Sequence, residues 1–409
     1  MNDLAIAPAA RPPPHHPSWS GSAIASWLVE HRGERVAPAR LLGELCRRLV
    51  AAGVPLMRAS CGLAALDPEL MGRQLVWRRG EEAAAEVPWR HGRAGRAAYL
   101  ASPMRVLHGG ATMVRRRLDG AAAALDFPLL EELAREGASD YLALPLRLSS
   151  GSVGYLSWVA ERPGGFSSEE LALLAELVPL FALRFEIEVG HQDSQTLLET
   201  YLGATAARRV LAGELARGHG QTIRAAILYA DIRGFTAMAE RLAAGEVIAL
   251  LDDYFECLAG AVHRHGGEVL KFIGDALLAV FNVDGASADS ACCLAADAAE
   301  DALAAMAALN VGRATPLEFG LALHMGDVVY GNIGALGRLD FTVIGPAVNE
   351  ATRLEALSRS LDEPVLISAS FARSCQCRPL LSLGRHTLRG VPEPQEVFTL
   401  ASEKADCAR

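Results

Sequence analysis

Apolar residues recur every three to four positions in two stretches of the first half of the chain, which predicts two amphipathic helices. The first helix follows Pro38, and its apolar positions are Leu41, Leu42, Leu45 and Leu49. The second follows Ser167, and its apolar positions are Leu171, Leu174, Leu177, Phe181 and Phe185. Ser167 and Glu170 have the spacing of a capping box, so we expect the second helix to begin there.

Apolar runs between these two helices predict strands near 56–66 and 74–78. Two further runs, DYLALPLRL at 140–148 and SVGYLSWVA at 152–160, flank a Ser-Ser-Gly turn and predict a β-hairpin. A strand, a hairpin and a closing helix together indicate an α+β domain.

The second half has a similar mixture. Apolar strands are predicted up to Asp231, on both sides of Gly274-Asp275, and at 320–329 and 340–344, with a long helix over 246–265. Another helix opens at Gly345-Pro346. The second half is therefore also expected to be α+β.

A chain of 409 residues is too long for one ordinary domain, so we expect two. Residues 1–37 are rich in Ala and Pro without a sustained period, which predicts a disordered tail. We expect a first domain at 38–188, a helical linker at 189–221 and a second domain at 222–401.

The net charge of −9, without a long Lys/Arg cluster, argues against a nucleic-acid partner. No window of about 18 residues is apolar and uncharged, so no membrane span is predicted. The prolines close to Met1 are unlike a signal peptide, and we expect a cytoplasmic protein.

The eight cysteines lack metal-ligand spacing. Cys292 and Cys293 are adjacent, and Cys375-Gln-Cys377 has no nearby second Cys pair or His pair, so we interpret all eight as reduced thiols that mostly pack in cores. All the tryptophans lie in the first half, namely Trp19, Trp27, Trp77, Trp89 and Trp158. Core packing is favoured for them over the lining of a small-molecule pocket.

Two aspartates, Asp231 and Asp275, each follow an apolar strand and lie at its turn, which suits a divalent-metal site at adjacent strand ends. Gly234 allows the backbone to approach a ligand, and the following helix start can hold phosphate oxygens. Asn349 and Arg353 are four residues apart and share one helix face, where they can hold ribose and phosphate. The alternative is an exposed face on which Arg353 pairs with a glutamate, either Glu350 or Glu355.

Four segments of the second half resemble the motifs of class III nucleotidyl cyclases in order and spacing. They are LYADIRGFT, GGEVLKFIGDALLAVF, GLALHMGDVVYGNIG and RLDFTVIGPAVNEATRLE. The resemblance covers roughly 222–400 and implies a ferredoxin-like βαββαβ fold. Over 38–188 the chain resembles a GAF domain in LALPL, Gly-x-Val-Gly-Tyr and Gly-Gly-Phe-Ser, which implies a regulatory or dimerising role and an unidentified small-molecule ligand.

The cyclase resemblance implies that Asp231 and Asp275, with the Ile232 carbonyl, bind two Mg²⁺ or Mn²⁺ ions. It implies that backbone N–H groups of Gly234, Phe235 and Thr236 hold the phosphates. These ions would assist attack of the ribose 3′-hydroxyl on the α-phosphorus.

The resemblance assigns the other half of the site to the next motifs. Asn349 would orient the ribose and Arg353 would stabilise charge on the α-phosphate. Lys271 and Thr342 match the base-selecting positions and imply ATP as the substrate, since a lysine donates to adenine N1 and a glutamate is usual in guanylyl cyclases. Arg389 stands where the family usually has a phosphate-binding lysine.

In the family the aspartates lie on one chain and Lys271, Thr342, Asn349 and Arg353 on its partner, so the resemblance implies a homodimer with shared sites. A guanylate cyclase and a non-catalytic nucleotide-binding scaffold are the alternatives. A cyclic-dinucleotide synthase is suggested only by Gly266-Gly267-Glu268-Val269, which lacks the signature that should follow.

Overall fold

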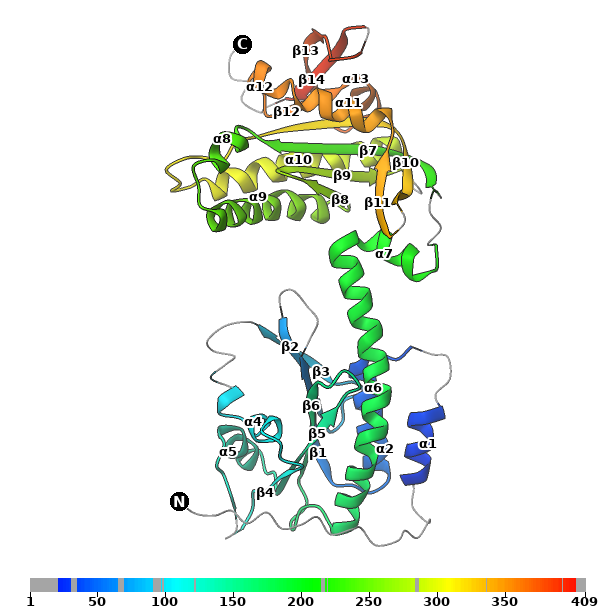
Figure 1. The fold of residues 1–409 in the computed structure, drawn as a ribbon, viewed down its shortest axis with the longest axis vertical. Helices are drawn as coiled ribbons and strands as arrows, with labels where there is room; N and C mark the ends of the chain where they lie inside the picture. Colours follow the sequence, from blue (N-terminus) through cyan, green and yellow to red (C-terminus); the bar gives the residue numbers. More distant parts are fainter. Residues whose placement is uncertain are drawn as a thin grey trace. The chain divides into compact units, whose positions relative to one another are not determined.

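The computed structural model describes residues 21–30, 35–64, 70–90, 97, 99–120, 123–214, 218, 220–283, 287–335, 337–391 and 393–401. The chain divides into two compact units, Met1–Leu197 and Leu198–Arg409 (Figure 1). Each unit contains both helices and a largely antiparallel sheet, so the predicted α+β class is confirmed. The predicted domain limits at 188 and 222 stay predictions.

The N-terminal unit is built on a six-stranded antiparallel sheet with the order β3-β2-β1-β6-β5-β4. Its strands are β1 (Leu56–Ala64), β2 (Leu70–Arg78), β3 (Ala85–Arg90), β4 (Val114–Arg117), β5 (Asp140–Arg147) and β6 (Val153–Ala160). Its helices are α1 (Gly21–Glu30), α2 (Pro38–Ala51), α4 (Met104–His108), α5 (Pro128–Arg135) and α6 (Ser168–Leu202), which continues past the unit boundary. The β5–β6 hairpin is the predicted one.

Helices cover both faces of this sheet. The Leu stripe of α2 packs with α6 on one face, whereas α4 and α5 pack on the other. Neighbouring residues of β5 show the alternation, because Leu142 belongs to the first core and Tyr141 to the second. The capping box is present, since Ser167 N–H donates to Glu170 Oε2 at 2.7 Å and Glu170 N–H donates to Ser167 Oγ at 3.2 Å.

Two tryptophans of this unit are core residues, as predicted: Trp77 is 1% exposed and Trp158 is fully buried. Trp27 is partly buried under Arg48, whose guanidinium carbon lies 4.7 Å from the ring centroid. Trp19 lies outside the described residues. The GAF-like identity of this unit stays a prediction.

Residues 21–30 correct the prediction of a continuous disordered tail, because they form α1. Ile24 and Leu28, four residues apart, are buried against the core that contains α2. This helix is short, and its apolar positions are too few to stand out in a segment rich in Ala and Pro. Most of the predicted tail, residues 1–20 and 31–34, lies outside the described residues.

The second unit contains an eight-stranded sheet with the order β13-β14-β12-β10-β7-β9-β8, and β11 pairs with β10. Its strands are β7 (Gly220–Ile232), β8 (Glu268–Ile273), β9 (Ala276–Asn282), β10 (Phe319–Ala335), β11 (Arg338–Ile344), β12 (Val365–Ser368), β13 (Leu380–His386) and β14 (Gln395–Leu400). Its helices are α7 (Ala204–Leu211), α8 (Phe235–Ala239), α9 (Ala244–Arg264), α10 (Ala288–Leu309), α11 (Pro346–Glu355), α12 (Ser358–Leu361) and α13 (Ala369–Ser374).

The elements β7, α9, β8, β9, α10 and β10 give the βαββαβ order, with the short α8 inserted after β7. Helices α9 and α10 lie on one face of the sheet and α11 on the other (Figure 1). The alternation along β7 agrees, because Leu228 packs with α9 and α10 while Ile227 packs with α11. The long β7–β10 pair at the centre carries the candidate site at one end.

The cysteines correct a second prediction. Cys293 and Cys377 form a disulfide, although all eight cysteines were expected to be reduced. Their Cα atoms lie 6.1 Å apart and their sequence separation is 84 residues. The fold brings α10 beside the loop that precedes β13, and local spacing in the sequence does not show that contact.

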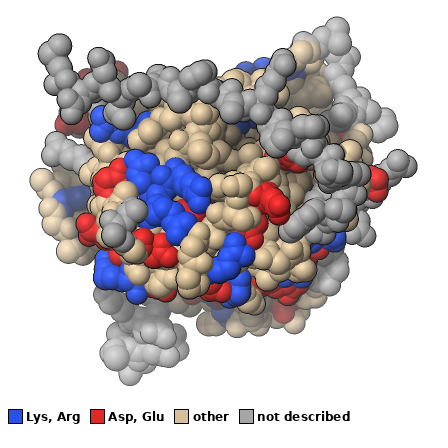
Figure 2. Space-filling model, turned by 90° about the horizontal axis from the view of Figure 1, so that it is seen from below, with Lys and Arg blue, Asp and Glu red and all other residues tan. Residues whose placement is uncertain are grey.

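The charged surface is mixed. Figure 2 shows one face on which Lys and Arg side chains gather with Asp and Glu side chains directly beside some of them. The three consecutive arginines of β4 illustrate local pairing, since each forms an ion pair with an aspartate. The pairs are Arg115–Asp140 at 2.7 Å, Arg116–Asp126 at 2.8 Å and Arg117–Asp119 at 3.0 Å.

Within the described ranges, we find no helix with both the length and the apolar character needed to cross a membrane. The expected cytoplasmic location stays a prediction.

Candidate functional site

The two predicted metal aspartates lie at neighbouring strand ends. Asp231 is the residue before the last in β7, and Asp275 follows Gly274 in the two-residue turn between β8 and β9. Ala230 pairs with Leu277 in the β7–β9 ladder, which places the Asp275 turn beside Asp231. Gly274 has φ of 65°, a left-handed conformation that suits glycine in this tight turn.

Asp231 occupies an unfavourable environment for an isolated carboxylate. Burial, the hydrogen bond with Asp275 and the charges of Asp275 and Glu355 raise the pKa of Asp231 to about 7. Among the described residues, its buried Oδ1 has no hydrogen-bond partner. A buried oxygen without a partner, next to a second carboxylate, is a natural ligand for a cation.

Glu355, at the end of α11, is a third carboxylate of this cluster. Burial and the charge of Asp275 raise the pKa of Glu355, while Ser358 and Arg233 act in the opposite direction. Gly320 pairs with Asp231 in the β7–β10 ladder, and a Cβ at Gly320 would lie only 2.2 Å from Glu355 Oε1. Sequence reasoning considered Glu355 only as a partner of Arg353, because nothing local shows that α11 ends over β10.

Arg233 ties the end of β7 to the segment after α11. Its Nη2 donates to the carbonyl oxygens of Ser358 and Glu363, each at 3.0 Å, and its Nη1 lies 3.8 Å from Asp362 Oδ1. The positive charge of Arg233 also acts on Glu355. Sequence reasoning missed this residue, whose guanidinium donates to two carbonyl groups that lie more than 100 positions away in the sequence.

The predicted phosphate-binding turn follows β7 directly. Gly234 has φ of 72° and precedes α8, so it adopts the left-handed conformation expected of a glycine at this turn. Phe235 and Thr236 are the first two residues of α8. Arg359 Nη2 lies 3.8 Å from the position of a Cβ on Gly234, which brings a cation to this turn.

The two predicted base-selecting residues come together around β11. Lys271 of β8 forms an ion pair with Asp340 of β11. Thr342 lies two positions further along β11, on the same strand face as Asp340, and is 9% exposed. The structure therefore adds Asp340, a residue that sequence reasoning missed, as the partner of the Lys271 ammonium group.

The remaining predicted residues lie on α11 and on the turn between β13 and β14. Asn349 is exposed and Arg353 is partly buried. The Arg353 guanidinium lies 3.5 Å from the position of a Cβ on Gly390, the neighbour of the exposed Arg389. Neither arginine forms an ion pair with a described residue, and Glu350 instead lies 3.6 Å from His324 Nε2. The alternative in which Arg353 pairs with Glu350 or Glu355 is therefore not observed.

The side chains of Arg353 and Glu355 point in different directions from α11. Residues two positions apart on an α-helix point about 200° apart. Glu355 belongs to the carboxylate cluster with Asp231 and Asp275, whereas Arg353 lies beside Gly390. A single chain thus holds the metal carboxylates in one place and Arg353, beside the β13–β14 turn, in another.

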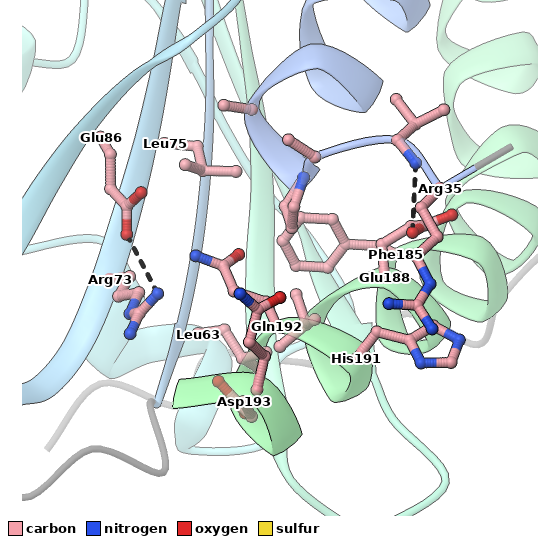
Figure 3. A pocket seen from close by; sticks show the side chains of 16 residues that line it. Arg35, Leu63, Arg73, Leu75, Glu86, Phe185, Glu188, His191, Gln192 and Asp193 are labelled. Atoms are coloured by element: carbon pink, nitrogen blue, oxygen red, sulfur yellow. Dashed lines mark hydrogen bonds and ion pairs between the residues drawn. The ribbon is translucent and has the colours of Figure 1, made fainter. Parts of the chain in front are cut away.

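The N-terminal unit contains a separate cavity of about 250 Å³ (Figure 3). Glu188, His191 and Gln192 of α6 lie on one side of it. Arg73 and Glu86 form a 3.5 Å ion pair on the other side, where the two side chains point toward each other (Figure 3). The small-molecule ligand expected for this unit stays a prediction, and this cavity is one place for it.

The second half of the chain is similar to known proteins. Residues 219–401 match the family model described as the adenylate and guanylate cyclase catalytic domain. An adenylate cyclase of Anabaena cylindrica is 34% identical over 168 residues, which cover 41% of this chain and 34% of the relative. The chain thus spans about a third of the length of the curated relatives it matches.

The chain is also similar to solved structures of an adenylyl cyclase and a guanylyl cyclase. The adenylyl cyclase CyaB from P. aeruginosa is 27% identical with a TM-score of 0.40, covering 46% of this chain and 98% of that one. The guanylyl cyclase Cya2 is 29% identical with a TM-score of 0.39, covering 46% of this chain and 97% of that one.

Proposed function

We propose that the adenylate/guanylate cyclase catalytic domain of residues 219–401 converts ATP to 3′,5′-cyclic AMP and pyrophosphate. The observation that carries this proposal is the buried, unpartnered Oδ1 of Asp231 beside Asp275, at the ends of adjacent strands. A buried carboxylate without a partner is costly in the absence of a cation. A nucleoside triphosphate binds as a complex with a divalent cation, so this substrate fits such a site. The similarity to an adenylate cyclase of Anabaena cylindrica supports the same reaction.

The carboxylates fit divalent ions. We assign Asp231, Asp275 and the Ile232 carbonyl oxygen as ligands of two Mg²⁺ or Mn²⁺ ions, since hard cations prefer oxygen donors. When bound, these ions lower the pKa of the ribose 3′-hydroxyl and neutralise charge on the pyrophosphate. Glu355 adds negative charge to the cluster from α11.

The protein groups that bind the phosphates in this proposal are backbone N–H groups and an arginine side chain. In this proposal the N–H groups of Gly234, Phe235 and Thr236 hold the β- and γ-phosphates where the chain turns at Gly234. Arg389 reaches the terminal phosphates from the β13–β14 turn, and its exposed side chain without an ion pair to a described residue supports this role.

Arg353 is the proposed transition-state residue, and Asn349 orients the ribose. Arg353 stabilises the charge that develops on the α-phosphate, an effect worth about 10³- to 10⁵-fold in rate for an arginine in phosphoryl transfer. Its guanidinium is not engaged by Glu350 or Glu355, so its donors are available to the substrate.

Lys271 and Thr342 read the base in this proposal. The Lys271 ammonium group donates to adenine N1, and the Thr342 hydroxyl can accept from the exocyclic amine. The ion pair with Asp340 holds Lys271 at the strand that carries Thr342. Guanine presents an N–H donor at position 1, and the lysine ammonium group cannot accept a hydrogen bond from it.

We further propose a homodimer with two shared sites. Within one chain Arg353 and Glu355 face different parts of the unit, so the arginine of a second copy is needed opposite Asp231 and Asp275. Exposed apolar side chains lie next to Asp275 and on either side of Thr342 along the chain, and they suit a protein interface. They are Phe272 and Ile273 beside Asp275, and Leu339 and Ile344 on β11.

Regulation by the N-terminal unit completes the proposal. Helix α6 begins in that unit and runs without interruption to Leu202 in the next one. A ligand or a subunit contact that moves α6 would therefore act on a helix that continues into the catalytic half of the chain.

Product analysis tests the reaction. Purified full-length protein is incubated with ATP or GTP and with Mg²⁺ or Mn²⁺, and the nucleotides are separated chromatographically. We expect cyclic AMP as the main product and its loss in the matched Asp231→Asn variant. Cyclic GMP as the main product would refute the base assignment, and no cyclic product from either nucleotide would favour a non-catalytic scaffold.

A further inference from the structure

Three cysteine sulfurs converge in the second unit, away from the predicted catalytic residues. Cys293 comes from α10, Cys375 follows α13, and Cys377 lies in the loop before β13. One ligand atom from each residue lies within 4.8 Å of the others. The Cys293–Cys377 disulfide uses two of these sulfurs, and Cys375 Sγ lies 3.6 Å from Cys377 Sγ.

The disulfide accounts for Cys293 and Cys377 but gives no role to the nearby Cys375 sulfur. A metal site built from thiolates would use all three sulfurs. In a tetrahedral Zn²⁺ site each Zn–S bond is about 2.3 Å, so the sulfurs lie about 3.8 Å apart. The Cys375–Cys377 separation of 3.6 Å is close to that spacing. The 6.1 Å between the Cα atoms of Cys293 and Cys377 accommodates two thiolates on one ion after reduction.

A carboxylate lies beside one of the three sulfurs and is the candidate for a fourth donor. Asp289 Oδ1 lies 3.6 Å from Cys293 Sγ, because the two residues are four apart on α10 and share one face. The same oxygen accepts the Gln376 N–H at 2.6 Å, which holds Asp289 against the Cys375–Cys377 loop. With the Asp289 carboxylate turned toward the ion, three sulfurs and one oxygen would match the donor number and type of a closed Zn²⁺ site.

We propose that the reduced Cys293, Cys375 and Cys377 thiolates, with Asp289 as an oxygen donor, bind a structural Zn²⁺ ion. Each thiol loses one proton as its sulfur binds the ion, so binding releases three protons to solvent. The disulfide is the oxidised alternative of the same cluster, and the two states exclude each other because they share Cys293 and Cys377.

The ion would fasten the segment before β13 to α10. Arg378, next to Cys377, already forms ion pairs with Asp297 and Glu300 of α10, the latter at 2.7 Å. The β13–β14 hairpin that follows carries Arg389 in its turn. Zn²⁺ binding is therefore expected to raise the thermal midpoint of the reduced protein without adding a ligand to the Asp231 cluster.

The test uses full-length protein reduced with a phosphine in the presence of a chelator, desalted and titrated with Zn²⁺ in excess Mg²⁺. We expect one Zn²⁺ per chain after gel filtration. Co²⁺ should give a thiolate-to-metal charge-transfer band, which oxygen ligands at the aspartates cannot produce. Loss of a second-shell partner typically weakens metal binding by about 10- to 100-fold, so Cys375→Ser should weaken it by more than about 100-fold.

The matched control is Cys257→Ser, a partly buried thiol outside the cluster, which should bind Zn²⁺ as the original chain does. Cys375→Ser leaves the Cys293–Cys377 pair intact, so its melting under oxidising conditions reports whether it folds. Independently of any variant, Zn²⁺ should protect the three cluster cysteines of the reduced protein from alkylation, as read by mass spectrometry. Failure of the reduced protein to retain Zn²⁺, a Co²⁺ complex without the thiolate band, or equal binding by Cys375→Ser would overturn the proposal.

Discussion

Arg353 and Glu355 are two positions apart on α11, yet they lie beside different glycines of the second unit. Glu355 approaches Gly320, which pairs with Asp231, whereas the Arg353 guanidinium approaches Gly390. One helix thus contributes a negative charge to the carboxylate cluster and a positive charge to another place. This separation is the structural reason to expect that each complete site needs two chains.

Subunit mixing tests the shared sites. Asp275→Ala and Arg353→Ala proteins should each be nearly inactive, and a mixture that exchanges subunits should regain about one quarter of the original activity. Half of the dimers would then be mixed, each with one intact site of two. Cyclic AMP formation and mass spectrometry of the dimers measure activity and exchange together.

The control for this experiment mixes two variants that both lack a metal-binding aspartate. Asp231→Asn mixed with Asp275→Ala should recover no activity, because no arrangement of these chains contains an intact metal half. Recovery in this control, or verified exchange without recovery in the first mixture, would contradict the assignment to opposite chains.

The base-selecting residues give a second prediction. Lys271→Glu combined with Thr342→Ser should lower kcat/KM for ATP by at least about 100-fold, because adenine N1 loses its donor and faces an acceptor. GTP should become the better substrate of the two. Competition between ATP and GTP, with both cyclic products quantified, provides the measurement.

Asp340→Asn is the comparison for base selection. It removes the ion-pair partner of the partly exposed Lys271 but leaves the ammonium group, so kcat/KM for ATP should change by less than about 10-fold. A variant at Lys271 that keeps its preference for ATP would show that Lys271 does not read the base.

The carboxylate cluster predicts a pH-dependent effect of metal. The pKa of Asp231 is raised to about 7, so its contribution to the stability of the metal-free protein is present below about pH 4 and is lost as the pH rises through 7. Mg²⁺ or Mn²⁺ binds the ionised form. The rise in thermal midpoint on adding metal should therefore be larger at pH 8 than at pH 5.

Asp231→Asn provides the control for this pH dependence. An amide stays neutral throughout the range, so the metal-free variant should be more stable than the original chain at pH 8 and should gain less from metal. An equal metal effect at pH 5 and pH 8 in the original chain would argue against ionisation of Asp231 in this range.

His324 predicts a second, opposite pH dependence. Burial lowers the pKa of His324 to about 4, because the ring has little access to water and its charged form is poorly solvated. Its Nδ1 lies 3.4 Å from Ser370 Oγ and its Nε2 lies 3.6 Å from Glu350 Oε2. Its contribution to stability is present above about pH 6.5 and is lost as the pH falls toward 4. The full loss is about 3 kcal/mol.

Denaturant unfolding from pH 7 to pH 4 measures this loss. His324→Gln should flatten the acid side of the stability profile, whereas His263→Gln, at an exposed position of α9, should leave the profile unchanged. If the His324 variant keeps the acid sensitivity of the original chain, other groups must be responsible for it.

Local sequence patterns predicted the elements that depend on local contacts. The Leu41-to-Leu49 stripe is buried on α2, and the Ser167–Glu170 capping box forms both of its hydrogen bonds. The β5–β6 hairpin also forms where the Ser-Ser-Gly turn indicated. Each of these features depends on residues within about twenty positions of one another, so propensity and periodicity suffice.

The features that the sequence did not show depend on distant residues. Cys293 and Cys377 meet only after α10 and the end of α13 pack together, and Glu355 joins Asp231 only because β10 places Gly320 next to β7. The ion pair of Lys271 with Asp340 likewise requires β8 and β11 to lie together. The motif resemblance assigned roles to individual residues but gave no information on these partners.

The missing side chain at Gly320 also has an evolutionary consequence. A Cβ there would meet both Glu355 Oε1 and Ser358 Oγ, so even alanine would force these two side chains away from their positions beside Asp231. Glycine and alanine codons differ by a single base at their second position. A single-base change of a mild kind would therefore displace a carboxylate of the cluster without replacing a charged residue, and we expect selection to act against it.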